Sequence, residues 1–190
     1  MDRREVLKMT SLLLGYSVLG TTTIAILDGC KADTGADWKP AFFTNDEVDL
    51  IAEICETILP KTDTPGAKDA FCHRWIDQVV SVFYDEEKKA DFKSNLQNFN
   101  QFAQDMYGKA FVALRESERE NVLEKMVQDA SKTKEDNKYP HIFNTMKELT
   151  ISGYCTSEIG AKGGLLDFRS VPGPYQGCIE YSTIGKAWAL

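Results

Sequence analysis

The order of apolar and polar residues predicts a series of helices between positions 44 and 151. Apolar residues recur three or four positions apart in five segments, which places them on one face of an α-helix. No strand-like alternation of useful length follows position 30. We therefore expect an all-α bundle of about five helices, followed by an irregular C-terminal arm. The apolar positions of the five segments are Val48, Ile51, Cys55 and Ile58; Cys72, Ile76, Val79 and Phe83, with Phe71 and Trp75 beside them; Phe92, Leu96, Phe99, Ala103 and Met106; Val122, Leu123, Met126, Val127 and Ala130; and Ile142, Phe143, Met146, Leu149 and Ile151.

Capping and breaking residues predict where these helices begin and end. Residues 44–47 have the spacing of a capping box, in which a Thr or Ser and a Glu three positions later each bond a free amide at the helix start. Residues 117–120, beginning with Ser117, repeat this spacing before the fourth helix. Pro60 ends the first helix, Gly108 ends the third, and Pro140 fits the first turn of the fifth.

The last part of the chain, residues 153–190, differs in composition. Seven of the thirteen glycines lie between Gly153 and Gly185, together with Pro172 and Pro174, so a regular helix throughout is excluded. Large apolar residues are frequent here, whereas disordered tails are usually poor in aromatic residues. We expect an ordered, irregular arm that lies over the helices or over a partner. Its large apolar residues are Tyr154, Ile159, Leu165, Leu166, Phe168, Tyr175, Tyr181 and Trp188.

Length and charge narrow the class of protein. A chain of 190 residues is about one domain long, and 43% apolar residues supply a hydrophobic core. The formal charge of −7 and the pI of about 4.9 argue against nucleic-acid binding, which favours a basic surface. Two histidines exclude a His-rich metal site. Because no Gly-x-Gly-x-x-Gly follows a predicted strand, we expect no dinucleotide cofactor in this chain.

The reactive side chains do not form a visible catalytic set. His73 directly follows Cys72 on a helix, where adjacent side chains diverge, and His141 stands at a helix start. We predict no catalytic, cofactor-binding or metal-binding residue in this chain. Three glutamates of the first helix are expected to form a solvated face rather than a metal site. They are Glu47, Glu53 and Glu56.

The N-terminus has the features of an export signal. The adjacent Arg3 and Arg4 precede Leu7 and Lys8, and the run from position 9 to 27 carries no charge. Glycines and threonines dilute this run, which is typical of a signal for the twin-arginine translocase. The alternative is a retained membrane anchor, which the run of 19 residues is long enough to form. We expect residues 1–29 to be an export signal and the mature protein to be periplasmic.

A cysteine follows this signal. Leu27, Asp28 and Gly29 precede Cys30, and Leu and Gly at these places resemble a lipoprotein cleavage site, whereas Asp28 is unusual there. Acylation of Cys30 would anchor a mature protein of 160 residues to the membrane, with residues 30–41 as a linker and residues 42–190 as one helical domain. The alternative is that Cys30 is the end of an uncleaved leader.

Cysteine spacing suggests disulfides. If Cys30 carries lipid, four of the five cysteines remain, and no Cys-x-x-Cys or haem-attachment motif occurs among them. Cys55 and Cys72 lie five residues outside either end of the 60–67 turn, so antiparallel helices would bring them face to face. Cys155 and Cys178 would then pair and close the arm in an oxidising compartment. The alternative is two buried free thiols at Cys55 and Cys72.

Two blocks of sequence resemble a known family. The first is ILPKTDTPGA at residues 58–67, and the second is GYCTSEIG at residues 153–160, followed by VPGPYQGC at 171–178 and KAW at 186–188. Together with the leader, they resemble the gluconate 2-dehydrogenase subunit 3 family over about residues 42–188.

The resemblance implies a small, non-catalytic subunit. In this family a large FAD-containing flavoprotein of the glucose–methanol–choline type oxidises a sugar, a sugar acid or a related alcohol. A cytochrome c subunit or another acceptor takes the electrons. The small subunit binds the flavoprotein and carries it through the twin-arginine pathway. FAD is thus expected on the partner and no cofactor in this chain.

The arm is the expected contact with the flavoprotein, because exposed apolar anchors on an irregular backbone suit docking to another protein. If the arm packs on its own helices instead, the turn at residues 62–66 is the next candidate. An alternative function is a free-standing exported lipoprotein, either an enzyme that uses Glu158 and Asp167 or a binding module without a dehydrogenase. The predicted partner contacts are Tyr154, Glu158, Ile159, Leu165, Phe168, Pro172 and Tyr175.

Overall fold

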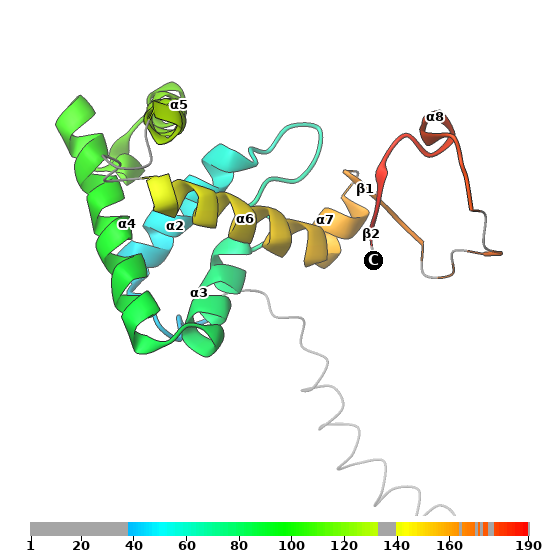
Figure 1. Cartoon of the computed structure of the whole chain (residues 1–190), viewed down its shortest axis with the longest axis horizontal. Coiled ribbons are helices and arrows are strands. Elements are labelled where there is room, and N and C mark those ends of the chain that lie inside the picture. Colours follow the sequence, from blue (N-terminus) through cyan, green and yellow to red (C-terminus); the bar gives the residue numbers. More distant parts are fainter. Residues whose placement is uncertain are drawn as a thin grey trace, which may run out of the picture. The chain divides into compact units, whose positions relative to one another are not determined.

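The computed structural model describes residues 38–132 and 140–189, apart from positions 164, 170, 172, 175 and 176. Contacts divide the chain into two units, Met1–Lys39 and Pro40–Leu190, and all described helices and strands belong to the second. This unit is mostly helical, so the all-α prediction is confirmed (Figure 1). The five predicted helices are α2 (Asn45–Ile58), α3 (Cys72–Phe83), α4 (Glu86–Tyr107), α5 (Glu116–Lys132) and α6 (Pro140–Thr156).

The first predicted capping box is confirmed. Thr44 Oγ1 accepts a hydrogen bond from the Glu47 amide at 3.3 Å, and the Thr44 amide donates to Glu47 Oε2 at 2.9 Å. Both bonds satisfy amides that the first helical turn leaves free. Helix α2 ends at Ile58, two residues before Pro60, as the sequence predicts.

The second predicted capping box is wrong in its register. Helix α5 begins at Glu116, so Ser117 lies inside its first turn. The Glu118 carboxylate instead accepts from the Arg115 amide at 2.9 Å and from the Arg115 guanidinium at 3.0 Å. Glu118 is the third helical residue, which is the position from which a glutamate reaches back to the residue before a helix.

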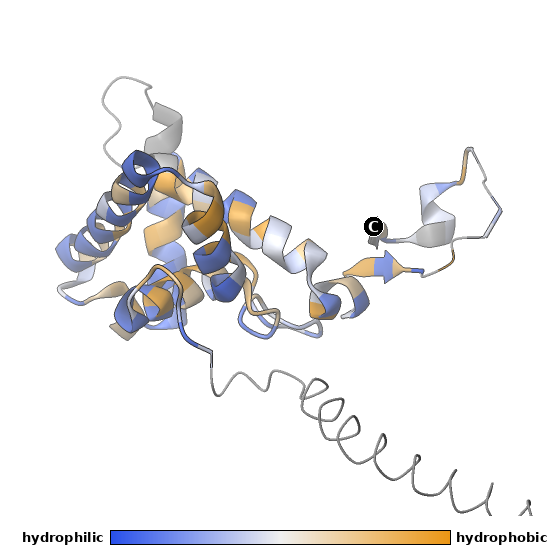
Figure 2. Ribbon diagram, turned by 90° about the horizontal axis from the view of Figure 1, so that it is seen from below, coloured by the Kyte–Doolittle hydropathy of each residue, from blue (hydrophilic) through white to orange (hydrophobic). Residues whose placement is uncertain are grey.

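Helix α6 occupies the centre of the bundle and packs against α2, α3, α4 and α5 (Figure 1). The apolar residues gather where these helices face one another (Figure 2). A short 3-10 helix, η1 (Phe111–Ala113), joins α4 to α5, and the Phe111 ring packs edge to face on Phe99 at 4.9 Å. The largest fully buried side chains include Ile51, Ile54, Ile76, Leu96, Phe99, Phe111, Met146 and Tyr154.

Helix α3 differs from its predicted pattern. Phe83 was expected in the core and is 76% exposed, because it is the last residue of the helix and the chain turns away at Tyr84. Asp77, in contrast, is buried at 2% exposure. Its carboxylate accepts hydrogen bonds from the amides of three successive residues, at 2.6, 3.1 and 2.9 Å. They are Ala41, Phe42 and Phe43. Asp77 therefore fixes the start of the helical domain onto α3.

The C-terminal arm begins later than predicted. Residues 153–156 form the last turn of α6, and the short helix α7 (Glu158–Lys162) follows at once. Beyond it, strands β1 (Leu166–Phe168) and β2 (Ala187–Ala189) pair in parallel with Leu166 opposite Ala187, and α8 (Tyr181–Ile184) lies between them in sequence. Within the described ranges, no helix is both long and apolar enough to cross a bilayer.

Candidate functional site

The two sequence blocks that suggested a family meet in space. Tyr154, near the end of α6, donates its hydroxyl to the Pro65 carbonyl at 2.8 Å. A Cβ on Gly163, just after α7, would lie 2.9 Å from the Pro65 ring. Pro65 belongs to the α2–α3 loop, residues 59–71, so this loop rests against the α6–α7 corner, residues 153–163.

A carboxylate from α2 holds both ends of this loop. Glu56 Oε1 accepts from the Lys61 amide at 3.0 Å, and Glu56 Oε2 accepts from the Lys68 amide at 2.8 Å. The carboxylate lies so close to Gly66 that a Cβ there would stand 2.4 Å from Glu56 Oε1. A side chain at position 66 would therefore displace the group that orders the loop.

Most of the remaining loop amides are also engaged. Ala67 donates to the Leu59 carbonyl at 2.9 Å, and Gly66 donates to Asp69 Oδ2 at 3.2 Å. The Thr62 amide bonds the Thr64 carbonyl at 3.0 Å, and the Thr64 amide bonds Thr62 Oγ1 at 3.4 Å. Six of the seven non-proline amides from position 61 to 68 thus have an acceptor. Residues 60–63 are exposed, so the loop presents an ordered polar tip to solvent.

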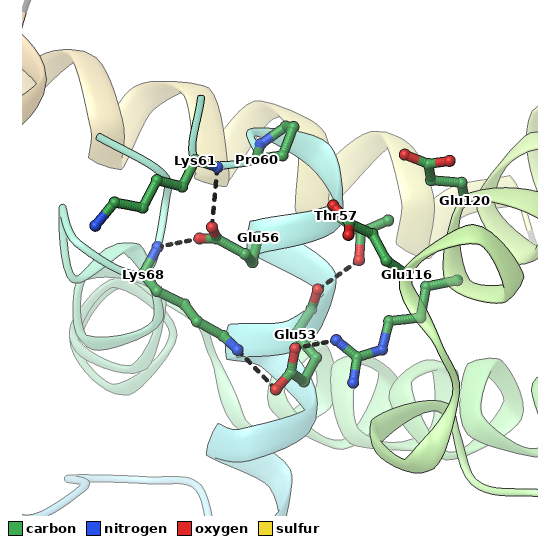
Figure 3. A pocket seen from close by; sticks show the side chains of 9 residues that line it. Glu53, Glu56, Thr57, Pro60, Lys61, Lys68, Glu116 and Glu120 are labelled. Carbon is green, nitrogen blue, oxygen red and sulfur yellow. Dashed lines mark hydrogen bonds and ion pairs between the residues drawn. The ribbon is translucent and has the colours of Figure 1, made fainter. Parts of the chain in front are cut away.

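A pocket of about 280 Å³ opens beside the loop (Figure 3). Inside it, the Glu53 carboxylate pairs with Lys68 at 2.6 Å and with the Arg119 guanidinium. Arg119 also donates to the carbonyls of Phe111 and Val112, at 3.3 and 2.7 Å. This ion triad joins α2, the α2–α3 loop and α5. The lining residues are Glu53, Glu56, Thr57, Pro60, Lys61, Lys68, Glu116, Arg119 and Glu120.

The three glutamates of α2 therefore do not form the predicted solvated face. Glu47 caps the helix and pairs with Lys93 at 3.3 Å, Glu53 belongs to the triad, and Glu56 binds loop amides. All three are half-buried. Among the described residues, no group of three or more His, Cys, Asp or Glu side chains could hold a metal ion.

The described cysteines are free thiols, so neither predicted disulfide is present in this structure. Cys55 and Cys72 are both fully buried and contact the same residue of α6. Thr150 Oγ1 donates to Cys55 Sγ at 3.2 Å, and Cys72 Sγ donates to the Thr150 carbonyl at 3.6 Å. Each sulfur thus has a hydrogen-bond partner on α6 in place of the other sulfur. Cys155 is half-buried, and Cys178 is exposed.

The groups with shifted pKa values in the core are poorly suited to catalysis. Burial raises the pKa values of Cys55 and Cys72 to about 12, so almost no thiolate forms near neutral pH. Burial lowers the pKa of His73 to about 4, with a smaller effect from Arg74. These shifts arise chiefly from loss of solvent, and the thiols and the imidazole lie in the helix packing rather than in the pocket.

The predicted partner contacts differ in how much of each side chain is exposed. Tyr154 is 1% exposed, so it is a core residue and not a surface contact, because its ring fills the space between α6 and the α2–α3 loop. Ile159 is half-buried, and Glu158 is exposed and pairs with Lys162 at 2.8 Å. The remaining described contacts, Leu165 and Phe168, are 45% and 44% exposed. Pro172 and Tyr175 lie outside the described residues, as do Arg3, Arg4, Leu7, Lys8 and Cys30.

Sequence reasoning missed three residues that organise this region: Glu56, Asp77 and Arg119. Each one bonds backbone groups or charges far away in sequence, so no local spacing identifies it. A signal did exist for Asp77, since it stands beside the apolar Ile76 and three positions before the apolar Val80, at helical spacing. A carboxylate at such a position needs buried donors.

Comparison with known proteins identifies the family of this chain. No curated protein and no solved structure matches it significantly. The model of the family described as gluconate 2-dehydrogenase subunit 3 matches residues 45–173, which include helices α2 to α7 and strand β1. The match covers more than half of the chain, as well as the α2–α3 loop and the α6–α7 corner that bind each other. The chain therefore belongs to the gluconate 2-dehydrogenase subunit 3 family.

Proposed function

We propose that this protein is the non-catalytic small subunit of a membrane-associated dehydrogenase complex. Its partner is a glucose–methanol–choline-type flavoprotein that holds FAD and oxidises a sugar, a sugar acid or a related alcohol. A cytochrome c subunit is the proposed electron acceptor. The observation that carries this proposal is the family match across residues 45–173, because the family is defined as a subunit of a dehydrogenase.

The use of the polar residues supports an accessory role. Glu53, Glu56 and Arg119 are paired with one another or with loop groups, and they hold the fold together. Glu158 and Asp167, the candidates for a free-standing enzyme, pair with Lys162 and Arg169 at 2.8 and 2.9 Å. Both carboxylates are engaged in surface ion pairs with residues two to four positions away, which supports a structural use for them.

The proposed partner surface has two parts. One is the arm, where Leu165 and Phe168 keep nearly half of their surface exposed, next to Glu158 and Ile159. The other is the exposed tip of the α2–α3 loop, residues 60–63, which Glu56 and Tyr154 hold in place. Loops that are fixed by a rigid scaffold bind partners with a small entropy cost. The close approach of Gly163 to Pro65 supports a partner surface that includes both the loop and the start of the arm.

Export and anchoring complete the proposal. The signal around Arg3, Arg4, Leu7 and Lys8 sends the folded chain, with its partner, through the twin-arginine translocase. Lipid on Cys30 then holds the complex at the membrane on the periplasmic side.

Co-purification tests the function. A C-terminally tagged chain is isolated from membranes in mild detergent, and the eluate is examined for a larger, yellow, FAD-containing chain with dehydrogenase activity. The expected result is a stoichiometric complex with that chain. A tagged protein that elutes alone, while the flavoprotein stays active elsewhere, contradicts the proposal and favours a free-standing lipoprotein.

A further inference from the structure

The pocket beside the α2–α3 loop is polar and of modest size (Figure 3). Seven of its nine lining residues carry a charge. Its volume of about 280 Å³ lies below the roughly 300–1,000 Å³ of small-molecule sites, which are mostly apolar. A cofactor or an apolar ligand is therefore a poor match for this pocket. A single charged side chain of another protein fits its size and its lining better.

The three cations that line the pocket already have carboxylate partners. Lys68 and Arg119 share the Glu53 carboxylate. Lys61 pairs with Asp69 at 3.0 Å. An anionic ligand would have to compete with these ion pairs for its donors, so the pocket is not arranged to receive an anion.

Two exposed carboxylates of the pocket, those of Glu116 and Glu120, come from α5 (Figure 3). Neither carboxylate pairs with any residue in the described part of the chain. They stand four positions apart, where like charges repel each other across one helical turn. Glu116 lies in the first turn and favours the helix dipole, but this effect fades beyond that turn and does not account for Glu120. A cation between the two carboxylates would offset their repulsion.

The pocket is continuous with the loop tip that forms part of the proposed partner surface. Pro60 and Lys61 line the pocket and also belong to this tip, residues 60–63. A partner that covers the tip therefore reaches the pocket as well. Because the partner also displaces water there, an ion pair formed in the pocket is stronger than one on an open surface.

We propose that this pocket receives a lysine or arginine side chain of the flavoprotein, held between Glu116 and Glu120. This inference rests on the proposed function and specifies the chemistry of one contact. The ammonium or guanidinium group donates hydrogen bonds to both carboxylates and relieves their repulsion. The carbon stem of the same side chain packs on Thr57 and Pro60, which line the pocket beside the two glutamates.

Binding measurements on the complex test the pocket. The tagged full-length protein is immobilised in mild detergent, and the purified flavoprotein is titrated onto it at about 0.15 M salt. Glu120→Gln removes one charge with almost no change of shape, and it should raise the Kd at least about tenfold. Glu120→Asp keeps the charge and should stay within about threefold of the parent protein.

Glu124 provides a matched control. It stands one turn after Glu120 on α5, is also exposed, and does not line the pocket. Glu124→Gln makes the same change of charge on the same helix and should leave the Kd within about twofold of the parent protein. Urea unfolding separates binding from folding. Because Glu120→Gln relieves the repulsion with Glu116, its unfolding midpoint should equal or exceed that of the parent protein.

Three results would overturn the inference. The first is a Kd that Glu120→Gln leaves unchanged or lowers, since no cation would then bind the pocket. The second is equal weakening by Glu120→Gln and either Glu124→Gln or Glu120→Asp, which would assign the effect to the general charge of α5 or to side-chain length. The third is a lower urea midpoint for Glu120→Gln, because its carboxylate would then serve the fold. A parent protein that binds no flavoprotein contradicts the proposed function instead, so the two failures are distinguishable.

Discussion

Tyr154 joins the α6–α7 corner to the α2–α3 loop through both its ring and its hydroxyl. Because the ring is 1% exposed, Tyr154→Ala should lower the free energy of unfolding by about 3–5 kcal/mol. Tyr154→Phe removes only the bond to the Pro65 carbonyl and should cost about 1 kcal/mol. Urea denaturation followed by circular dichroism measures both values.

Tyr181→Phe is the control for this prediction, since Tyr181 is 70% exposed and its hydroxyl bond to Gly185 is 3.4 Å long. It should be nearly neutral. A Tyr154→Ala protein as stable as the parent would place Tyr154 outside the core. For partner binding, Tyr154→Phe is the more useful variant, because it loosens the loop while the bundle stays folded.

His73 should make stability depend on pH. Burial lowers its pKa from 6.5 to about 4 in the folded protein, so between these values the unfolded chain binds more protons than the folded one. Stability contributed by the neutral imidazole is present above pH 6.5 and is lost as the pH falls toward 4. His73→Gln should therefore flatten the rise of the unfolding free energy between pH 4.5 and 6.5, measured by urea titration. An identical slope in both proteins would contradict the pKa shift, since carboxylates titrate equally in each.

Helices α2, α3 and α6 meet at a pair of thiols that Thr150 keeps hydrogen-bonded. With pKa values of about 12, Cys55 and Cys72 carry a thiolate fraction of only about 10⁻⁴ at pH 8. In the folded protein, iodoacetamide at pH 8 should label the exposed Cys178 within minutes and leave Cys55 and Cys72 unlabelled until urea is added. Peptide mass spectrometry reads the sites.

The same experiment distinguishes a thiol pair from a disulfide. If a peptide linked between Cys55 and Cys72 appears without reductant, the pairing expected from their spacing is correct for the exported protein. The fold offers a reason for the opposite result. A chain that folds before export buries both sulfurs in a reducing compartment, and they then meet no oxidant.

Local patterns predicted the helices well and the tertiary bonds poorly. The apolar spacing of α2 to α6 and the Thr44–Glu47 capping box depend on residues within one or two turns, so the sequence contains the whole signal. Glu56 and Asp77 instead bind amides 5 to 36 positions away, and an isolated carboxylate in a helix looks like a surface residue. Ser117 and Glu120 have the spacing of a capping box, but Glu118 stands in the same relation to Arg115 and makes the bond.

Tyr154 lies in the core rather than in the predicted arm for a related reason. The many glycines after position 153 suggested an arm that starts there, whereas Gly153 lies within α6 and Tyr154 packs in the core. Composition over a window of thirty residues cannot separate the last turn of a helix from the irregular chain that follows.

The fourth prediction concerns the export of this protein together with its partner. If the small subunit carries its partner through the twin-arginine translocase, Arg3→Lys/Arg4→Lys should leave both chains and the dehydrogenase activity in the cytoplasm. Activity is measured in periplasmic, membrane and cytoplasmic fractions. Glu86→Lys/Glu87→Lys, on the exposed first turn of α4, makes a larger charge change away from the signal and should export normally. Periplasmic activity without the small subunit would show that the flavoprotein has its own route.

Two glycines of the α6–α7 corner restrict which sequences can adopt this fold. A Cβ added to Gly153 would lie 2.7 Å from the Trp75 ring. A Cβ added to Gly160 would lie 1.9 Å from the Tyr154 carbonyl oxygen. Neither has a positive φ, so the backbone itself would accept alanine and only the neighbouring atoms forbid it. An added side chain is therefore excluded by steric clash alone. At position 153, a smaller residue in place of Trp75 would remove that clash. Trp75 and Gly153 thus act as a matched pair of sizes, and a smaller residue at position 75 would make room for a side chain at position 153 without moving α3 away from α6.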